Sequence, residues 1–140
     1  MGLTVIDYSE VYFALLNDAP VPTRRGGKFV VMTNGDRRYA VFSPRELSAY
    51  HANVVERFLW QQGIKGRYNE KGDLFRFVSG DWEVEGGGHW ELDEAEGILQ
   101  ISGYSKSYGG VDLDGLASQL RQTDAFRAIR VVIVPGMGIL

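Results

Sequence analysis

The chain has 140 residues, of which 44% are hydrophobic, and it carries a formal net charge of −3 at pH 7. That size suits one domain that buries its own core without disulfides or metals. The acidity argues against general nucleic-acid binding, and no apolar run is long enough to cross a membrane. Cysteine is absent, which excludes cysteine-nucleophile mechanisms and is compatible with a reducing cytoplasm. We therefore expect a soluble cytoplasmic protein, monomeric or homodimeric, with no nucleic-acid or membrane partner.

The N-terminal part of the chain, residues 1–27, is predicted to form an extension that precedes a domain over 28–140. A short helix is expected over 8–17, with an apolar run at 11–16. Two prolines and a glycine pair disfavour regular structure over 18–27, which indicates a linker. The apolar run also allows a protein-interaction function, in which this segment docks a partner or a second copy of the chain.

Alternating strands and helices fill the rest of the chain. β-branched residues predict a strand over 28–33, which the turn signal at Asn34-Gly35 connects to a strand over 38–42. The order of elements predicts an α/β fold, α+β-like in character, with a single mixed sheet of about six strands flanked by two main helices. The later elements are expected as strands over 67–78, 82–92 and 98–104, a helix over 112–122, and a strand over 129–134 that ends at Pro135-Gly136.

The first long helix is expected to begin with Ser43 as its N-cap, Pro44 at the first helical position and Glu46 completing a capping box. It is expected to reach Gly63. At 100° per residue His51 falls on the apolar stripe of this helix, so its ring should point toward the sheet. Two interpretations follow: a core histidine hydrogen-bonded to a carbonyl, or a neutral imidazole held at a site as a base or nucleophile.

The segment from Gly103 to Gly110 is a second candidate site, because it places a glycine-rich loop between a strand and a helix. Backbone N–H groups in such a loop, with the positive end of the following helix, can bind an anion. Ser105 and Ser107 supply hydroxyl donors, and Lys106 supplies a positive charge. A plain strand-to-helix turn is the alternative interpretation, because the segment matches no phosphate-binding fingerprint.

Two acidic patterns are interpreted as structural. The Asp-x-Asp pattern at Asp112 and Asp114 resembles the nucleophile motif of haloacid dehalogenase-type phosphatases. Two glycines precede it, however, and Asp112 is expected to cap a helix. The carboxylates over 91–96 are predicted to lie on a solvated hairpin. No histidine pair accompanies them, so we expect no metal site.

Three short motifs follow the order, and approximately the spacing, of the phosphohistidine phosphatase family, which includes the Janus proteins. They are Tyr50-His51-Ala52, the triple glycine at 86–88 and the serine-containing segment at 103–109. The chain resembles that family from about Lys28 to Val134. The resemblance implies a six-stranded mixed sheet flanked by two helices, and hydrolysis of phosphate from protein histidine without a metal or cofactor.

The resemblance also implies roles for individual residues. His51 inherits the catalytic role, as nucleophile or general base. Two family arginines are replaced here: His89 follows the triple glycine, and Arg45 lies two residues from the arginine position before the catalytic helix, so both are further candidates. The residues expected to bind phosphate are Lys28, Ser105, Lys106, Ser107 and Gly109.

The expected substrate is a phosphohistidine-containing protein or a small phosphoramidate. A P–N bond is labile once its nitrogen is protonated, so such an enzyme needs mainly positioning and charge stabilisation. The alternative is a non-catalytic module of the same fold that binds phosphate or a phosphorylated partner protein.

Overall fold

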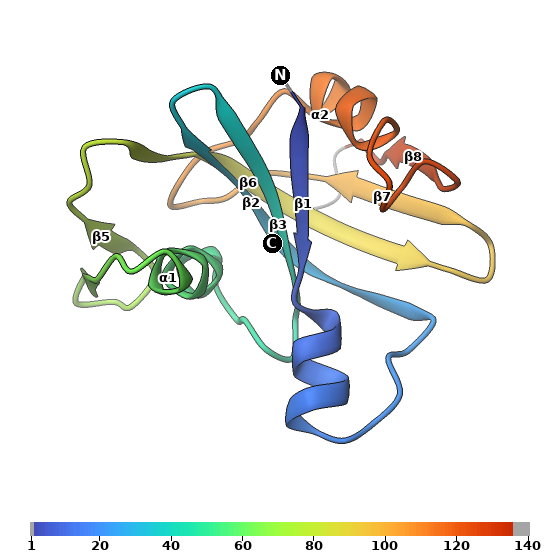
Figure 1. Ribbon diagram of the computed structural model, residues 1–140, viewed down its shortest axis with the longest axis horizontal. Helices are drawn as coiled ribbons and strands as arrows, with labels where there is room; N and C mark the ends of the chain where they lie inside the picture. Colours follow the sequence, from blue (N-terminus) through green and yellow to red (C-terminus); the bar gives the residue numbers. More distant parts are fainter. Residues whose placement is uncertain (1, 136–140) are drawn as a thin grey trace.

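A six-stranded mixed sheet forms the centre of the computed structural model, which describes residues 2–135 (Figure 1). The outermost strand pair at each edge is parallel and the other pairs are antiparallel. The mixed sheet and the α/β class predicted from the sequence are therefore confirmed. In spatial order the strands are β1 (Leu3–Asp7), β3 (Arg37–Pro44), β2 (Arg24–Asn34), β6 (Trp82–Asp93), β7 (Ile98–Ser102) and β8 (Arg130–Ile133).

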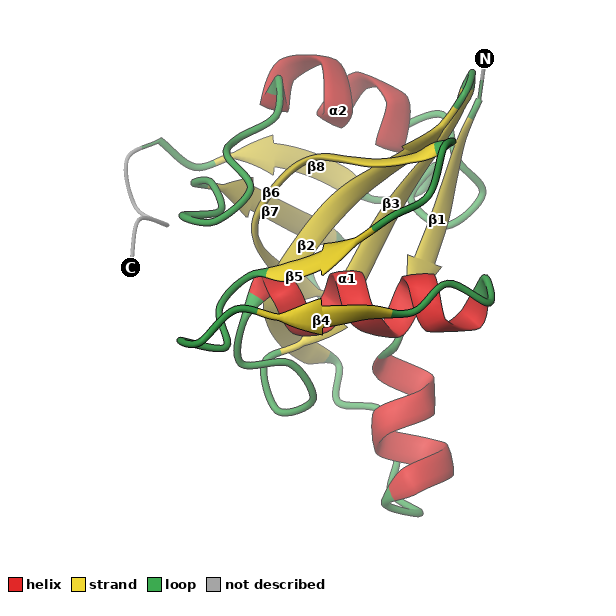
Figure 2. Cartoon of the chain, turned by 90° about the vertical axis from the view of Figure 1, so that its left-hand side faces the viewer, coloured by secondary structure: helices red, strands yellow, loops and turns green. Residues whose placement is uncertain are grey.

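Helices cover both faces of the sheet (Figure 2). The helix α1 (His51–Gln61) packs on one face, and α2 (Leu113–Leu120) packs on the other. A separate antiparallel hairpin, β4 (Gly66–Tyr68) and β5 (Phe75–Phe77), lies on the α1 side. Within residues 2–135 no helix has the length and hydropathy that crossing a membrane requires.

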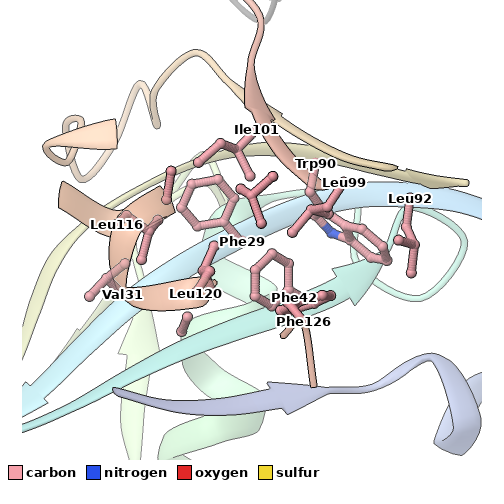
Figure 3. Packing of buried hydrophobic residues seen from close by; sticks show 13 residues of the cluster. Phe29, Val31, Phe42, Trp90, Leu92, Leu99, Ile101, Leu116, Leu120 and Phe126 are labelled. Carbon is pink, nitrogen blue, oxygen red and sulfur yellow. The ribbon is translucent and has the colours of Figure 1, made fainter. Parts of the chain in front are cut away.

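Side chains of β2 alternate between the two faces and so join two separate cores. Phe29 and Val31 belong to the cluster beneath α2, whereas Val30 and Met32 belong to the cluster beneath α1. In the α2-side cluster, Phe42 lies with its ring centroid 5.5–5.7 Å from three other aromatic rings (Figure 3). The buried members of that cluster are Phe29, Val31, Ala40, Phe42, Trp90, Leu92, Leu99, Ile101, Leu116, Ala117, Leu120, Phe126 and Val131.

The N-terminal segment differs from the sequence prediction. Residues 3–7, assigned to an extension, form the edge strand β1, which pairs in parallel with β3. The predicted linker is also shorter, because β2 already begins at Arg24. Between them the expected short helix is a π-helix, η1 (Val11–Leu16), which projects from the sheet and buries none of its residues (Figure 1). Parallel pairing with β3 holds β1 in the sheet. The three β-branched residues at 4–6 favour a strand locally, a signal that the prediction of an extension overlooked.

The start of the first long helix was also predicted wrongly. Ser43 and Pro44 end β3, where they pair with Lys28 and Gly27 of β2. The buried Ser43 hydroxyl lies 2.7 Å from that of Ser48. A single turn follows Pro44, and α1 begins only at His51. Strand pairing here outweighs a local capping pattern, because the residue that resembles a cap is already fixed in the sheet.

Smaller differences concern the later elements. The expected strand over 67–78 is broken into β4 and β5, which leave the central sheet entirely. The strand predicted over 98–104 ends at Ser102, and Asp112 occupies the N-cap position of α2 as expected. Gly136, named as the end of the last strand, lies outside the described residues.

Candidate functional site

The imidazole of His51 lies between the start of α1 and the middle of β6. The preceding residue, Tyr50, is extended, with φ −125° and ψ 154°, and its backbone N–H donates to the Asn53 side chain at 2.9 Å. His51 is therefore the first residue of the helix and not part of a central stripe. It still faces the sheet, as the helical spacing predicted, and only 7% of its surface is exposed.

The triple glycine of β6 is what lets this ring approach the strand. Gly87 faces α1, and a Cβ there would lie 2.5 Å from the carbonyl oxygen of Phe29 and 2.9 Å from Cδ2 of His51. Gly86 faces the other side, where a Cβ would lie 2.3 Å from the carbonyl oxygen of Gly110. Any side chain at these positions would therefore displace the histidine or the loop after β7.

A hydrogen bond fixes the tautomer of His51. Its Nε2 lies 2.8 Å from the carbonyl oxygen of Gly88, and a carbonyl can only accept, so Nε2 carries the proton. The edge of the ring that carries Nε2 and Cδ2 lies against β6. Nδ1 is on the opposite edge, and within residues 2–135 it has no hydrogen-bond partner. The neutral ring therefore keeps a lone pair on Nδ1.

Burial keeps this imidazole neutral. It lowers the pKa of His51 from 6.5 to about 4, and the charges of His89 and Lys28 act in the same direction. The hydrogen bond to Gly88 opposes the shift, because it favours the protonated ring. Above pH 5 the side chain is therefore an uncharged base or nucleophile.

A cleft of about 330 Å³ opens beside His51. Such a volume is at the small end of ligand pockets, which span about 300–1,000 Å³. Lys28 and His89 are direct cross-strand partners on β2 and β6, and both face the cleft from the α1 side of the sheet. The lining residues are Lys28, Ala49, Tyr50, His51, Asp73, His89, Tyr104, Lys106 and Ser107.

The loop after β7 contains a tight turn from Ser105 to Gly109, in which three of the five backbone amides are hydrogen-bonded within the turn. Ser105 and Gly109 exchange backbone hydrogen bonds at 3.1 and 2.8 Å, and the carbonyl of Gly109 accepts from the Gly87 amide at 3.0 Å. The hydroxyl of the buried Ser105 accepts from the amide of Tyr108 at 3.0 Å. The amides of Lys106 and Ser107 have no partner within residues 2–135. These two amides, and not that of Ser105, are free to meet an anion.

The structure thus divides the predicted site residues into two groups. His51, Lys28, Lys106, Ser107 and His89 line one cleft. The other three, Ser105, Gly109 and Arg45, do not line it.

Those three residues have other contacts. Ser105 and Gly109 shape the loop from within. Arg45 is exposed and forms an ion pair with Glu91. Its positive charge acts on the cleft from a distance: together with burial, it lowers the pKa of Lys28. Arg45 therefore does not take the place of the arginine that the resemblance leads us to expect before the helix.

His89 likewise does not replace the second arginine as a fixed charge. Burial and the neighbouring Lys28 lower its pKa from 6.5, so its ring is mostly neutral at pH 7. The rings of His89 and His51 lie edge to face, with centroids 5.5 Å apart. His89 therefore contributes a hydrogen-bonding ring, while Lys28 and Lys106 supply the positive charge.

Sequence reasoning missed Asp73, which lies on the connection between β4 and β5. Two side-chain hydroxyl groups, through three hydrogen bonds, fasten this connection and β5 to the loop after β7. The Ser107 hydroxyl donates to the Asp73 carbonyl oxygen at 2.6 Å, and the Tyr108 hydroxyl bonds both the N–H and the C=O of Phe75. No spacing pattern places Asp73 at the cleft. Tyr104 was likewise not singled out, and Tyr50 only within the Tyr-His-Ala motif.

The polar side chains of the cleft can be compared with those of a metal site. Among residues 2–135, no three His, Asp or Glu side chains gather closely enough to hold a metal ion. Besides the Asp73 carboxylate and the His89 ring, the cleft offers the neutral His51 nitrogen, two ammonium groups and two backbone N–H groups. This set is suited to binding an anion and placing it against Nδ1 of His51.

Replacement of Gly87 by alanine should destabilise the fold and move His51. We expect the free energy of unfolding to fall by about 1–3 kcal/mol, because backbone atoms cannot give way to the new methyl group. Urea denaturation measures the loss, and the imidazole NMR signals report the displacement. Gly80→Ala is the matched control, since a Cβ there meets nothing within 4 Å. Equal stability of the two variants would contradict this account.

The buried histidine should make stability depend on pH. Between the unfolded-state pKa of 6.5 and the folded-state pKa of about 4, the unfolded chain binds the proton more readily. Acidification through this window should therefore lower the free energy of unfolding, by on the order of 3 kcal/mol. Denaturation from pH 7 to 4 should show the fall in wild type and in His89→Gln, and a much smaller one in His51→Gln. Parallel profiles for wild type and His51→Gln would show that His51 is not the titrating group.

Comparison with known proteins adds no family assignment. A scan against protein-family models finds no match, and a search of curated proteins finds no relative.

Proposed function

We propose that this protein is a metal-independent phosphatase that hydrolyses phosphohistidine in a protein or in a small phosphoramidate. The observation that carries the proposal is the tautomer of His51: Nε2–H is held by the Gly88 carbonyl, 2.8 Å away, which leaves the lone pair on Nδ1. The sequence resemblance to phosphohistidine phosphatases supports it, because the resembling motifs at His51, at the triple glycine and at Lys106–Ser107 meet around one cleft.

The cleft supplies the positive groups that a phosphoryl group needs. Lys28 and Lys106 carry charge, and the free amides of Lys106 and Ser107 can donate to phosphate oxygens. The hydroxyl of Ser107 is already committed to the Asp73 carbonyl. Binding therefore relies on the main chain of this loop and on the two lysines.

The Nδ1 lone pair of His51 has two possible uses, attack on phosphorus or removal of a proton from the attacking water. Burial keeps the ring neutral above pH 5, so this lone pair is present at neutral pH for either use. We assign His51 as the nucleophile, acting through Nδ1, and the trapping experiment below distinguishes this role from that of a base.

The reaction balances as two displacements at phosphorus. Nδ1 of His51 forms a P–N bond while the bond to the substrate imidazole breaks, and that imidazole leaves neutral with the proton it carried. Water then attacks phosphorus, the bond to Nδ1 breaks, and the water protons end on phosphate and solvent. While Nδ1 is phosphorylated, the His51 ring is cationic and its Nε2–H still donates to Gly88.

Removal of the His51 imidazole should abolish activity. With a phosphohistidine peptide in the presence of EDTA, we expect wild type to release phosphate and His51→Ala to lose at least about 100-fold in kcat. His89→Ala is the matched control from the same cleft and should lose much less. Equal rates for wild type and His51→Ala would end the catalytic assignment. If wild type binds the phosphohistidine peptide but releases no phosphate, the protein is a non-catalytic binding module instead.

A phosphorylated His51 should be trappable during turnover. We expect rapid quenching into alkali, in which phosphohistidine persists, to leave ³²P from a labelled peptide on wild type and none on His51→Gln. Peptide mapping should place the label at His51. Full turnover with no label on the protein would show that water attacks directly and that His51 acts as a base.

A further inference from the structure

Asp73 places a carboxylate in a cleft whose other charged groups are positive. It is half-buried and lines the same cleft as Lys28, Lys106 and His51. A negative charge there repels a phosphoryl group, so phosphate binding alone gives no reason for it. Its presence calls for a second, positively charged part of the ligand.

The main chain of Asp73 is fixed while part of its carboxylate is free. The Asn69 side chain accepts from the amides of Asp73 and Leu74, both at 3.1 Å, and donates to Oδ1 of Asp73 at 2.8 Å. The Ser107 hydroxyl holds the Asp73 carbonyl from the other side. Oδ2 makes no hydrogen bond within residues 2–135. One carboxylate oxygen is thus anchored and the other is available to a ligand.

We infer that Asp73 is a specificity-determining residue that binds the N–H of the leaving group and selects phosphoramidates over phosphate esters. This inference rests on the proposed function and deepens it. A phosphohistidine imidazole that is ready to leave carries a positive charge and an N–H donor. The bridging oxygen of a phosphate ester carries no proton, and its leaving group becomes anionic. A carboxylate therefore favours the first and disfavours the second.

Two aromatic side chains at the same cleft suit a flat cationic leaving group. Tyr50 is 51% exposed and Tyr104 is 41% exposed, although each is a large hydrophobic residue. Tyrosine rings attract cations at their faces and stack on planar groups. Together with Asp73 they supply the chemistry that an imidazolium requires.

Asp73→Asn tests the inference with little disturbance of the loop, because the new side chain keeps an oxygen that can accept from Asn69. The measurement is kcat/KM for a phosphohistidine peptide and for p-nitrophenyl phosphate. We expect the ratio of the two values to fall at least tenfold, through slower hydrolysis of the peptide, while hydrolysis of the ester is unchanged or faster. Asp81→Asn, an exposed carboxylate away from the cleft, is the control for net charge. An unchanged ratio, including equal losses on both substrates, would overturn the inference. Asp73 would then serve only to hold the connection between β4 and β5 in place.

Binding separates this inference from the proposed function. If wild type hydrolyses neither substrate, the proposed activity fails, and the phosphohistidine peptide then persists long enough for calorimetry. The inference still requires wild type to bind that peptide more tightly than the matching phosphoserine peptide, and Asp73→Asn to remove the preference. No preference in wild type, or a preference that survives in the variant, would overturn it.

Discussion

The site depends on one hydrogen bond, from Nε2 of the His51 ring to the carbonyl oxygen of Gly88. It exists because Gly87 has no side chain, so that the ring can rest on the backbone of β6. The bond determines which ring nitrogen carries the proton and which edge of the ring faces away from the strand. Burial against the strand then keeps the ring uncharged. The chemistry proposed for Nδ1 follows from these three constraints together.

Patterns within a single element were predicted well, whereas features that depend on distant segments were not. The hairpin at Asn34-Gly35, the long strand β6 and the helix α2 were all visible in spacing and turn residues. β1 was missed although the β-branched residues at 4–6 favour a strand, because only its pairing with β3 shows that this short run belongs to the sheet. The helix start at Ser43 was wrong because that residue belongs to the sheet. Local propensity is a weak prior that pairing and burial override.

The site was predictable to the extent that its residues lie in recognisable segments. His51, Lys28 and the loop at Lys106–Ser107 could be named from helix spacing, strand position and glycine content. The two interpretations offered for His51 are also not exclusive, since its ring is both bonded to a carbonyl and open to a cleft. Asp73 could not be found, because only contacts with Ser107 and Asn69 bring it there.

Charge balance argues for the kind of molecule that this cleft accepts. With both histidines mostly neutral near pH 7, two lysines and one aspartate leave the cleft with one net positive charge. A phosphoryl group brings a charge of about −2, and an attached imidazolium brings one positive charge, so the ligand carries about −1 overall. The charges also match by position, because the lysines can contact the phosphoryl group and Asp73 can contact the imidazolium. A phosphate ester carries the same −2 with nothing to place against Asp73, and would leave that carboxylate both unpaired and repelled.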